Sequence, residues 1–165
     1  MNDQSPFPGD YELAQEAWKT LLNYLGENPD REGLKETPKR ILKSWKELFG
    51  GYYQKPEDIL TTFEEDDVVP KDQIILLKDI EFYSTCEQHF LPFSGKAHVA
   101  YMPNDKVVGI SKLARIVEIY ARRLQIQERV GNQITQSLKD LLKSKVAACI
   151  IESKHFCMTC RGVEQ

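Results

Sequence analysis

A cysteine and a histidine lie three positions apart in the stretch FYSTCEQHFLPF, and two cysteines have the same spacing near the end of the chain. The first pair is Cys86 and His89, and the second is Cys157 and Cys160. Thiolate and imidazole are preferred ligands of Zn²⁺, and paired ligands at this short spacing are typical of zinc sites. The residue types therefore indicate a metal site to which both segments contribute.

The two pairs allow two kinds of zinc site. All four side chains would form a closed Cys3His site, the structural kind, whereas Cys86, His89 and Cys157 alone would leave one position for water, the catalytic kind. Spacing alone favours the structural site. However, if residues 157–163 form a strand, Cys157 and Cys160 point to opposite faces because side chains alternate along a strand.

Two further histidines need separate interpretations. On the expected strand His155 lies on the same face as Cys157, where it suits proton transfer to a metal-bound water. A surface or hydrogen-bonded histidine is the competing interpretation, and the residues leave both open. His98 lies in an alternating strand without a cysteine nearby in sequence, so a structural role is expected.

The N-terminal part of the chain is expected to be helical. Asp10 is a suitable N-cap for a first amphipathic helix that Gly26 ends. Thr37-Pro38 supplies the cap and first position of a second helix, which Gly50-Gly51 ends. The acidic run at residues 64–67 is expected to be a solvated loop.

Strands and helices then alternate in a recognisable order. The segments QIILLKDIEFY and SGKAHVAYM are predicted strands, because the second alternates and both are rich in strand-forming residues. The segment from Ser111 to Ser144 predicts two amphipathic helices, with Ser111 as a cap and Gly131 either between them or within the second. VAACIIES predicts a strand, and FCMTCRGVEQ is expected to begin another.

This order predicts an α+β fold: an antiparallel β-β-α-α-β-β sheet with a helix pair on one face, preceded by N-terminal helices. Residues 1–70 are expected to form an N-terminal helical segment packed on the core. Residues 71–165 are expected to form the catalytic unit, with one structural domain overall.

Composition and charge argue against several classes of protein. No apolar run approaches the roughly 18 residues of a membrane span, and the start lacks the apolar segment of a secretion signal. A cytoplasmic protein that binds no membrane is therefore expected. A pI of about 5.7 argues against nucleic acid as a partner. Basic residues predominate after residue 105, which suits an anionic ligand or a solvated helix face.

Three long stretches resemble the GTP cyclohydrolase I family in order and spacing: STCEQHFLPFSGKAHVAYMP, GISKLARIVEIYARRLQIQERV and ESKHFCMTCRGV. REGLKETPKRI resembles the segment that precedes them, so the resemblance spans roughly residues 30–163. It implies the tunnelling fold, in which antiparallel β-β-α-α-β-β units assemble into barrels. It also implies a homodecamer of two stacked pentamers with active sites between subunits.

The resemblance implies a zinc-dependent reaction of GTP and water that yields formate and 7,8-dihydroneopterin triphosphate, a step toward tetrahydrofolate or related pterins. Zinc would activate a water for attack at C8 of guanine. His155 would exchange protons as the imidazole ring opens. Glu128 would accept two N–H donors from the guanine edge, which rejects adenine because the wrong base leaves the carboxylate unpaired.

The implied site residues fall into three groups. They are Cys86, His89 and Cys157 for zinc; His155, Gln88 and Ser111 for catalysis, Ser111 in the later sugar rearrangement; and Glu128, Gln127, Lys112, Arg115, Arg161 and Arg40 for GTP, the last four at the triphosphate. Without the resemblance, solvated helix charges and an arginine partner for Glu128 are the competing interpretations.

The sequence departs from the family pattern at position 88. The family motif C-E-H-H becomes C-E-Q-H here, so glutamine replaces a catalytic histidine and not a zinc ligand. Slowed turnover is therefore expected. The alternative is a catalytically silent, zinc-stabilised protein that binds GTP or supports assembly on the same fold. A related nitrile reductase is disfavoured because the chain lacks motifs for NADPH reduction. Cys160 is expected to be a spectator.

Overall fold

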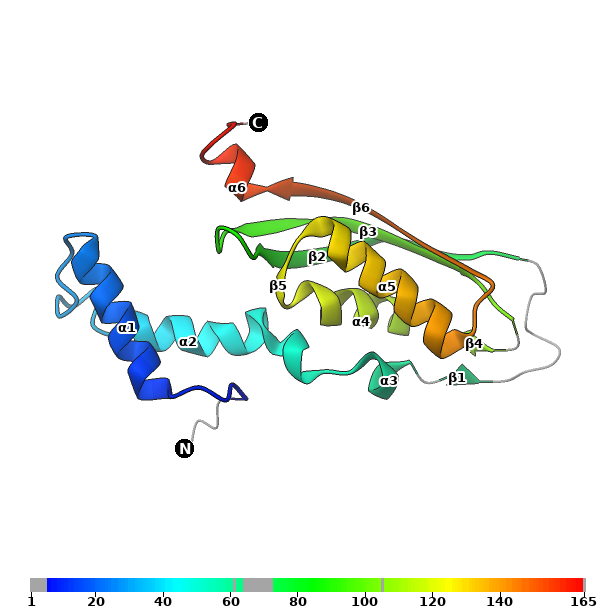
Figure 1. The fold of residues 1–165 in the computed structure, drawn as a ribbon, viewed down its shortest axis with the longest axis horizontal. Helices are drawn as coiled ribbons and strands as arrows, with labels where there is room; N and C mark the ends of the chain where they lie inside the picture. Colours follow the sequence, from blue (N-terminus) through cyan, green and yellow to red (C-terminus); the bar gives the residue numbers. More distant parts are fainter. Residues whose placement is uncertain (1–5, 61, 64–72, 105, 165) are drawn as a thin grey trace. The chain divides into compact units, whose positions relative to one another are not determined.

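The computed structural model describes residues 6–60, 62–63, 73–104 and 106–164 (Figure 1). The chain divides into two compact units, Met1–Gly50 and Gly51–Gln165. The boundary expected between residues 70 and 71 lies outside the described residues, as does the acidic run at 64–67. Among the described residues, no helix has the length and apolar character needed to cross a membrane.

The first unit contains helices α1 (Tyr11–Tyr24) and α2 (Thr37–Leu48). Asp10 caps α1 as predicted, because its carboxylate accepts the backbone N–H groups of Glu12 and Leu13 at 2.8 and 3.0 Å. Gly26 follows the helix with φ of +82°, a conformation that glycine adopts without strain.

The remaining elements belong to the second unit or begin at its boundary, and the long ones all lie after residue 74. They are η1 (Gly50–Tyr53), α3 (Pro56–Ile59), β1 (Thr62–Phe63), β2 (Ile75–Cys86), β3 (Pro92–Met102), β4 (Val107–Val108), α4 (Ile110–Ala121), β5 (Leu124–Gln125), α5 (Gln127–Leu142), β6 (Val146–His155) and α6 (Phe156–Thr159).

The main sheet has the strand order β5-β2-β3-β6. β3 pairs antiparallel with both β2 and β6, whereas the short β5 runs parallel to the end of β2. Helices α4 and α5 cover one face of this sheet (Figure 1), and the core between them includes the fully buried residues Phe93, Val99, Leu113, Val130 and Ile134. The predicted α+β class and the helix pair on one face are confirmed.

A β-bulge interrupts β2 between Leu77 and Ile80. Asp79 adopts φ of +58° there, and its backbone N–H donates to His98 Nδ1 on β3 at 3.2 Å. The side chain of His98 thus satisfies a backbone donor that the irregular ladder leaves unpaired. This contact agrees with the structural role expected for His98.

Two local predictions need correction. The strand expected over residues 157–163 is not formed: α6 follows β6 directly, and residues 160–164 contain no strand. The reason lies in the register of β6, which pairs His155 with Phe93, the second residue of β3. The next position opposite β6 is Pro92, which has no N–H to donate to a longer ladder. The second correction concerns α4, whose N-cap is Gly109 and not Ser111.

Candidate metal centre

A tight loop places Cys86 and His89 beside each other. Cys86 is the last residue of β2, and its N–H donates to the carbonyl of Leu91 while its own carbonyl accepts the N–H of Phe90. Phe90 has φ of +56°, so the chain reverses within this loop. The reversal brings the His89 ring over the end of the strand, with Nδ1 at 3.6 Å from the Cys86 sulfur.

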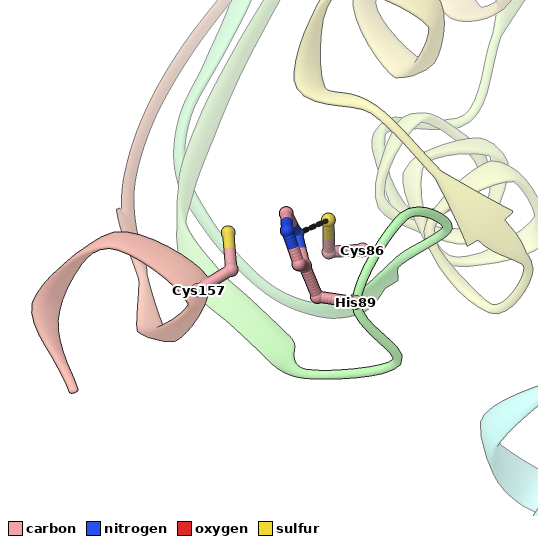
Figure 2. A group of neighbouring side chains, drawn as sticks. All are labelled: Cys86, His89 and Cys157. Atoms are coloured by element: carbon pink, nitrogen blue, oxygen red, sulfur yellow. Dashed lines mark hydrogen bonds between the residues drawn. The ribbon is translucent and has the colours of Figure 1, made fainter. Parts of the chain in front are cut away.

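The register of the sheet brings the third ligand candidate to this loop. β6 ends at His155 opposite Phe93, and the first turn of α6 then carries Cys157. Figure 2 shows Cys157 pointing from α6 toward the two side chains of the loop. His155 was expected on a strand face shared with Cys157. It closes β6 instead, whereas Cys157 belongs to the helix.

The three side chains have the geometry of a zinc site. Their candidate ligand atoms all lie within 4.8 Å of one another, and among the described residues this is the one such group of three or more. In a tetrahedral zinc site, bonds of about 2.3 Å to sulfur and 2.0–2.1 Å to nitrogen separate these two atoms by about 3.6 Å. The sulfur–nitrogen distance of 3.6 Å between Cys86 and His89 matches that separation.

The fourth cysteine of the two sequence pairs lies outside the group. The Cys160 thiol donates to the carbonyl of Phe156 at 2.7 Å and is exposed. Strand alternation was the wrong reason for separating Cys160 from Cys157, because both lie in or directly after a helix. Burial raises the pKa of the remaining cysteine, Cys149, to about 11, which keeps that thiol protonated and a poor ligand.

The electrostatics of the group favour a cation. Burial raises the pKa of the Cys157 thiol, and the neighbouring Cys86 sulfur raises it further, while Arg161 acts in the opposite direction. Two thiolates at this separation repel each other, and a divalent metal between them removes that repulsion. The group is therefore compatible with zinc.

His155 lies next to this group and is held on three sides. Its ring stacks on Phe93, with ring centroids 4.7 Å apart and planes at 5°. Its Nε2 lies 2.9 Å from Gln127 Oε1 and 3.0 Å from Ser153 Oγ. The amide of Gln127 has a fixed orientation, because its Nε2 donates to the carbonyl of Ile151 at 3.1 Å.

These contacts define the histidine tautomer. Gln127 Oε1 can only accept, so the proton of His155 is on Nε2. Nδ1 is then the nitrogen that can accept another proton. Sequence reasoning missed Phe93 and Ser153. Ser153 precedes His155 by two residues on β6, so strand alternation could have indicated it, whereas only the register between β3 and β6 brings Phe93 to His155.

A pocket of about 380 Å³ opens beside the metal group. Glu128 lies on its wall, exposed in the first turn of α5, and makes no ion pair with any described residue. The arginine partner of the competing interpretation is therefore absent from the described part of the chain. The sequence-predicted residues that line the pocket are Cys86, Gln88, His89, Gln127, Glu128, His155, Cys157 and Arg161.

Four other predicted residues are not among those that line this pocket. Ser111, Lys112 and Arg115 belong to the first half of α4, whereas the end of α4 leads into β5 beside Cys86. Ser111 is ten residues from the end of α4, about 15 Å along the helix axis. Arg40 belongs to the first unit, on α2.

An ion pair that sequence reasoning missed borders the pocket. Arg129 donates through both terminal nitrogens to the carboxylate of Glu87, with Nη2 at 3.0 Å from Oε1 and Nη1 contacting Oε2. The hydrogen bond to Arg129 lowers the pKa of the Glu87 carboxyl. The sequence patterns of the segments CEQH and QERV did not indicate that these two segments contact each other.

The fold and the grouped side chains define a class: an α+β protein with a zinc-compatible Cys2His group at the edge of a pocket. A family profile described as GTP cyclohydrolase I matches residues 14–165. The GTP cyclohydrolase 1 proteins of Brucella canis, Brucella abortus and Brucella suis are each 53% identical to this chain over 159 residues. Each match covers 96% of this chain and 73% of the relative.

The chain belongs to the GTP cyclohydrolase I family, as the sequence motifs predicted. Its curled antiparallel sheet with a helix pair is consistent with that family's tunnelling fold. Membership identifies the chain as an enzyme and supports hydrolysis and cyclisation of GTP as its activity.

Proposed function

We propose that this chain is a cytoplasmic, zinc-dependent enzyme that converts GTP and water to formate and 7,8-dihydroneopterin triphosphate. One observation carries the proposal: the Cys86–His89–Cys157 group lies in the same pocket as Glu128 and His155. Hydrolysis of a purine ring needs a group of metal ligands, a free carboxylate and an oriented histidine.

Cys86, His89 and Cys157 would hold the zinc. Three protein ligands leave one position open, and zinc in such a site supplies a water whose pKa is lowered to near neutral. The remaining steps fall to side chains of the chain itself. The protein positions the base, excludes bulk water from the pocket and moves protons.

His155 would exchange protons with the guanine imidazole ring through Nδ1, because Nε2 is already committed to Gln127 and Ser153. Gln127 was expected beside Glu128 at the guanine edge. The side-chain amide of Gln127 forms hydrogen bonds with Ile151, Ser153 and His155. We therefore propose that Gln127 orients His155 instead of binding the base.

Glu128 would select guanine. The guanine edge presents an N–H and an amino group side by side, and one carboxylate can accept both. Adenine lacks the ring N–H at this edge, so its binding would leave a carboxylate oxygen unpaired. The absence of an ion pair to Glu128 among the described residues supports its availability for the base.

We further propose that the active site is completed in a homodecamer of two pentamers. Arg161 lies in the pocket, whereas Lys112, Arg115 and Ser111 lie along α4, away from it. Contributions from α4 of a neighbouring subunit would bring cations to the triphosphate and Ser111 to the sugar. Arg40 remains a further candidate for the triphosphate.

A catalytically silent GTP-binding protein is the second candidate, and Gln88 favours it. Gln88 lines the pocket next to His89. An amide does not titrate near neutral pH, so it cannot replace a histidine as acid or base.

A turnover assay distinguishes the two candidates. The purified chain, loaded with one equivalent of Zn²⁺, is incubated with GTP, and formate and pterin fluorescence are measured separately. We expect both products, and neither product from Cys157→Ala or after chelation. GTP binding with no formate would establish the silent protein.

A further inference from the structure

Glu87 connects the loop of metal ligands to the helix that faces the base. It lies between Cys86 and Gln88, and its carboxylate receives both terminal nitrogens of Arg129. Its backbone N–H also donates to the carbonyl of Gln125 at 3.0 Å. The loop is therefore attached to the start of α5 by one side-chain contact, and to β5, which precedes that helix, by one backbone contact.

Arg129 lies in the same helical turn as two residues of the proposed site. Gln127 and Glu128 precede it directly in α5. Gln127 in turn holds His155. A shift of the loop at Glu87 would thus be passed through Arg129 to the turn that carries both Gln127 and Glu128.

The geometry of the pair suits positioning better than stabilisation. Both side chains are partly exposed, Arg129 at 42% and Glu87 at 33%, and ion pairs of this kind add little to folding stability. A two-pronged guanidinium–carboxylate contact, however, fixes distance and orientation, which a single contact does not. The ion pairs Lys19–Glu16, Arg31–Glu27, Lys96–Asp79 and Arg122–Glu118 are single contacts by comparison.

We propose that Glu87 and Arg129 are positioning residues that couple metal binding at the 86–89 loop to nucleotide binding at the first turn of α5. Metal binding joins the 86–89 loop to Cys157 of α6, and the ion pair transmits the resulting position of the loop to Glu128. Zinc and nucleotide then each increase the affinity for the other by the same factor, as linkage requires. The inference rests on the proposed function, because it assumes that both ligands bind in this pocket.

The test measures the affinity for 7-deaza-GTP with and without Zn²⁺. This analogue carries CH in place of N7, so C8 no longer lies between two ring nitrogens as an electrophilic carbon, and hydrolysis cannot release formate from it. For the unaltered chain we expect zinc to tighten 7-deaza-GTP binding at least about fivefold, the low end of measured couplings. Glu87→Gln and Arg129→Gln should each remove most of this ratio. The double variant should lose no more than either single variant.

Two variants serve as controls. Arg129→Lys keeps the charge but not the two-pronged contact, and should retain part of the ratio. Glu118→Gln removes an exposed ion pair with Arg122 on α4, and should leave the ratio unchanged. In the Co²⁺-substituted chain, 7-deaza-GTP should change the visible absorption of the metal, and Glu87→Gln should abolish that change.

The possible failures are distinguishable. Unchanged ratios in the Glu87 and Arg129 variants, or a ratio near one in the unaltered chain, would overturn the coupling and leave the proposed function intact. Failure of 7-deaza-GTP to bind in either metal state would overturn the proposed function together with the inference.

Discussion

The short spacing between Cys86 and His89 has its cause in the backbone of one loop. Two hydrogen bonds close the loop on Cys86, and Phe90 takes a positive φ to complete the reversal. The sulfur and the imidazole nitrogen consequently lie 3.6 Å apart before any metal is considered. A site that is preformed on two of its three sides loses little conformational freedom on binding an ion.

The first prediction separates the third ligand from the spectator. Cys157→Ala should abolish binding of one zinc per subunit, because it removes one of three ligands. Cys160→Ala should leave zinc content unchanged, because that thiol bonds the carbonyl of Phe156 outside the group. Elemental analysis of the purified variants measures both. Loss of zinc from the Cys160→Ala variant would instead show that Cys160 is a fourth ligand and that the site is a structural Cys3His site.

A second prediction concerns position 88. Gln88→His should raise turnover of GTP at least roughly tenfold, because a positioned acid or base contributes about 10²–10⁴-fold and glutamine contributes none. Binding of GTP and zinc should change little, since glutamine and histidine have similar reach. Steady-state kinetics give kcat and KM separately. If kcat stays constant, Gln88 does not occupy an acid–base position in this chain.

Residue types and spacing indicated Cys86, His89, Cys157 and Cys160 as candidate ligands. The resemblance to the family, and not the spacing, reduced these four to three. Phe93 and Arg129 could not be predicted, because their contacts depend on strand register and on how α5 meets the loop. Glycine and alternation patterns carry no information about such pairings between distant segments.

At the scale of elements, most of the sheet follows from alternation. The strands β2, β3 and β6 and the helices α4 and α5 appear where periodicity predicts them, and Gly131 lies inside α5. The end of β6 was predicted wrongly, because strand propensity in FCMTC says nothing about the partner strand. Pro92 offers no donor at the next position, and the chain turns into α6.

Glycines at two positions should respond to alanine in opposite directions. At Gly95 in β3 an added Cβ would lie 1.9 Å from the carbonyl oxygen of Glu152 in β6, so the strands must separate. Such overpacking typically costs 1–3 kcal/mol, about 2–4 °C in melting temperature for each kcal/mol. At Gly131 the nearest atom is at 3.7 Å, an ordinary contact.

Gly131→Ala should therefore raise the melting temperature, because alanine gains up to about 1 kcal/mol over glycine within a helix. Thermal unfolding followed by circular dichroism measures both variants under identical zinc loading. A Gly95→Ala variant as stable as the original chain would show that β3 and β6 separate without cost, which contradicts the close approach at this position.

At the scale of the whole molecule, β6 forms the long outer edge of the main sheet. Ile150 and Val146 are exposed on it at 63% and 53%. A long edge strand with exposed apolar residues pairs readily with another chain. This edge supports the proposed assembly of subunits into a barrel. The sequence pattern of a single chain does not determine that assembly.

The last prediction tests the proposed sharing of residues between subunits. Lys112→Ala and Arg115→Ala should weaken GTP binding by about 10- to 100-fold each and guanosine binding little, because each removes a charge-assisted hydrogen bond to phosphate. Glu128→Ala should weaken both ligands alike, since it removes a contact to the base. Equal losses of GTP and guanosine affinity in the Lys112 and Arg115 variants would refute their assignment to the triphosphate.

Mixed oligomers then show which subunit supplies each residue. If Lys112 and Glu128 of one site come from different subunits, random mixing of Lys112→Ala with Glu128→Ala subunits restores about one quarter of the sites. If both come from one subunit, no site is restored, because every subunit carries one lesion. Mixing Lys112→Ala with Arg115→Ala is the matched control: both residues lie on the same α4, so no arrangement of subunits rebuilds an intact site. If the site is shared between subunits, intact sites form in the mixture of Lys112→Ala with Glu128→Ala and do not form in the control mixture.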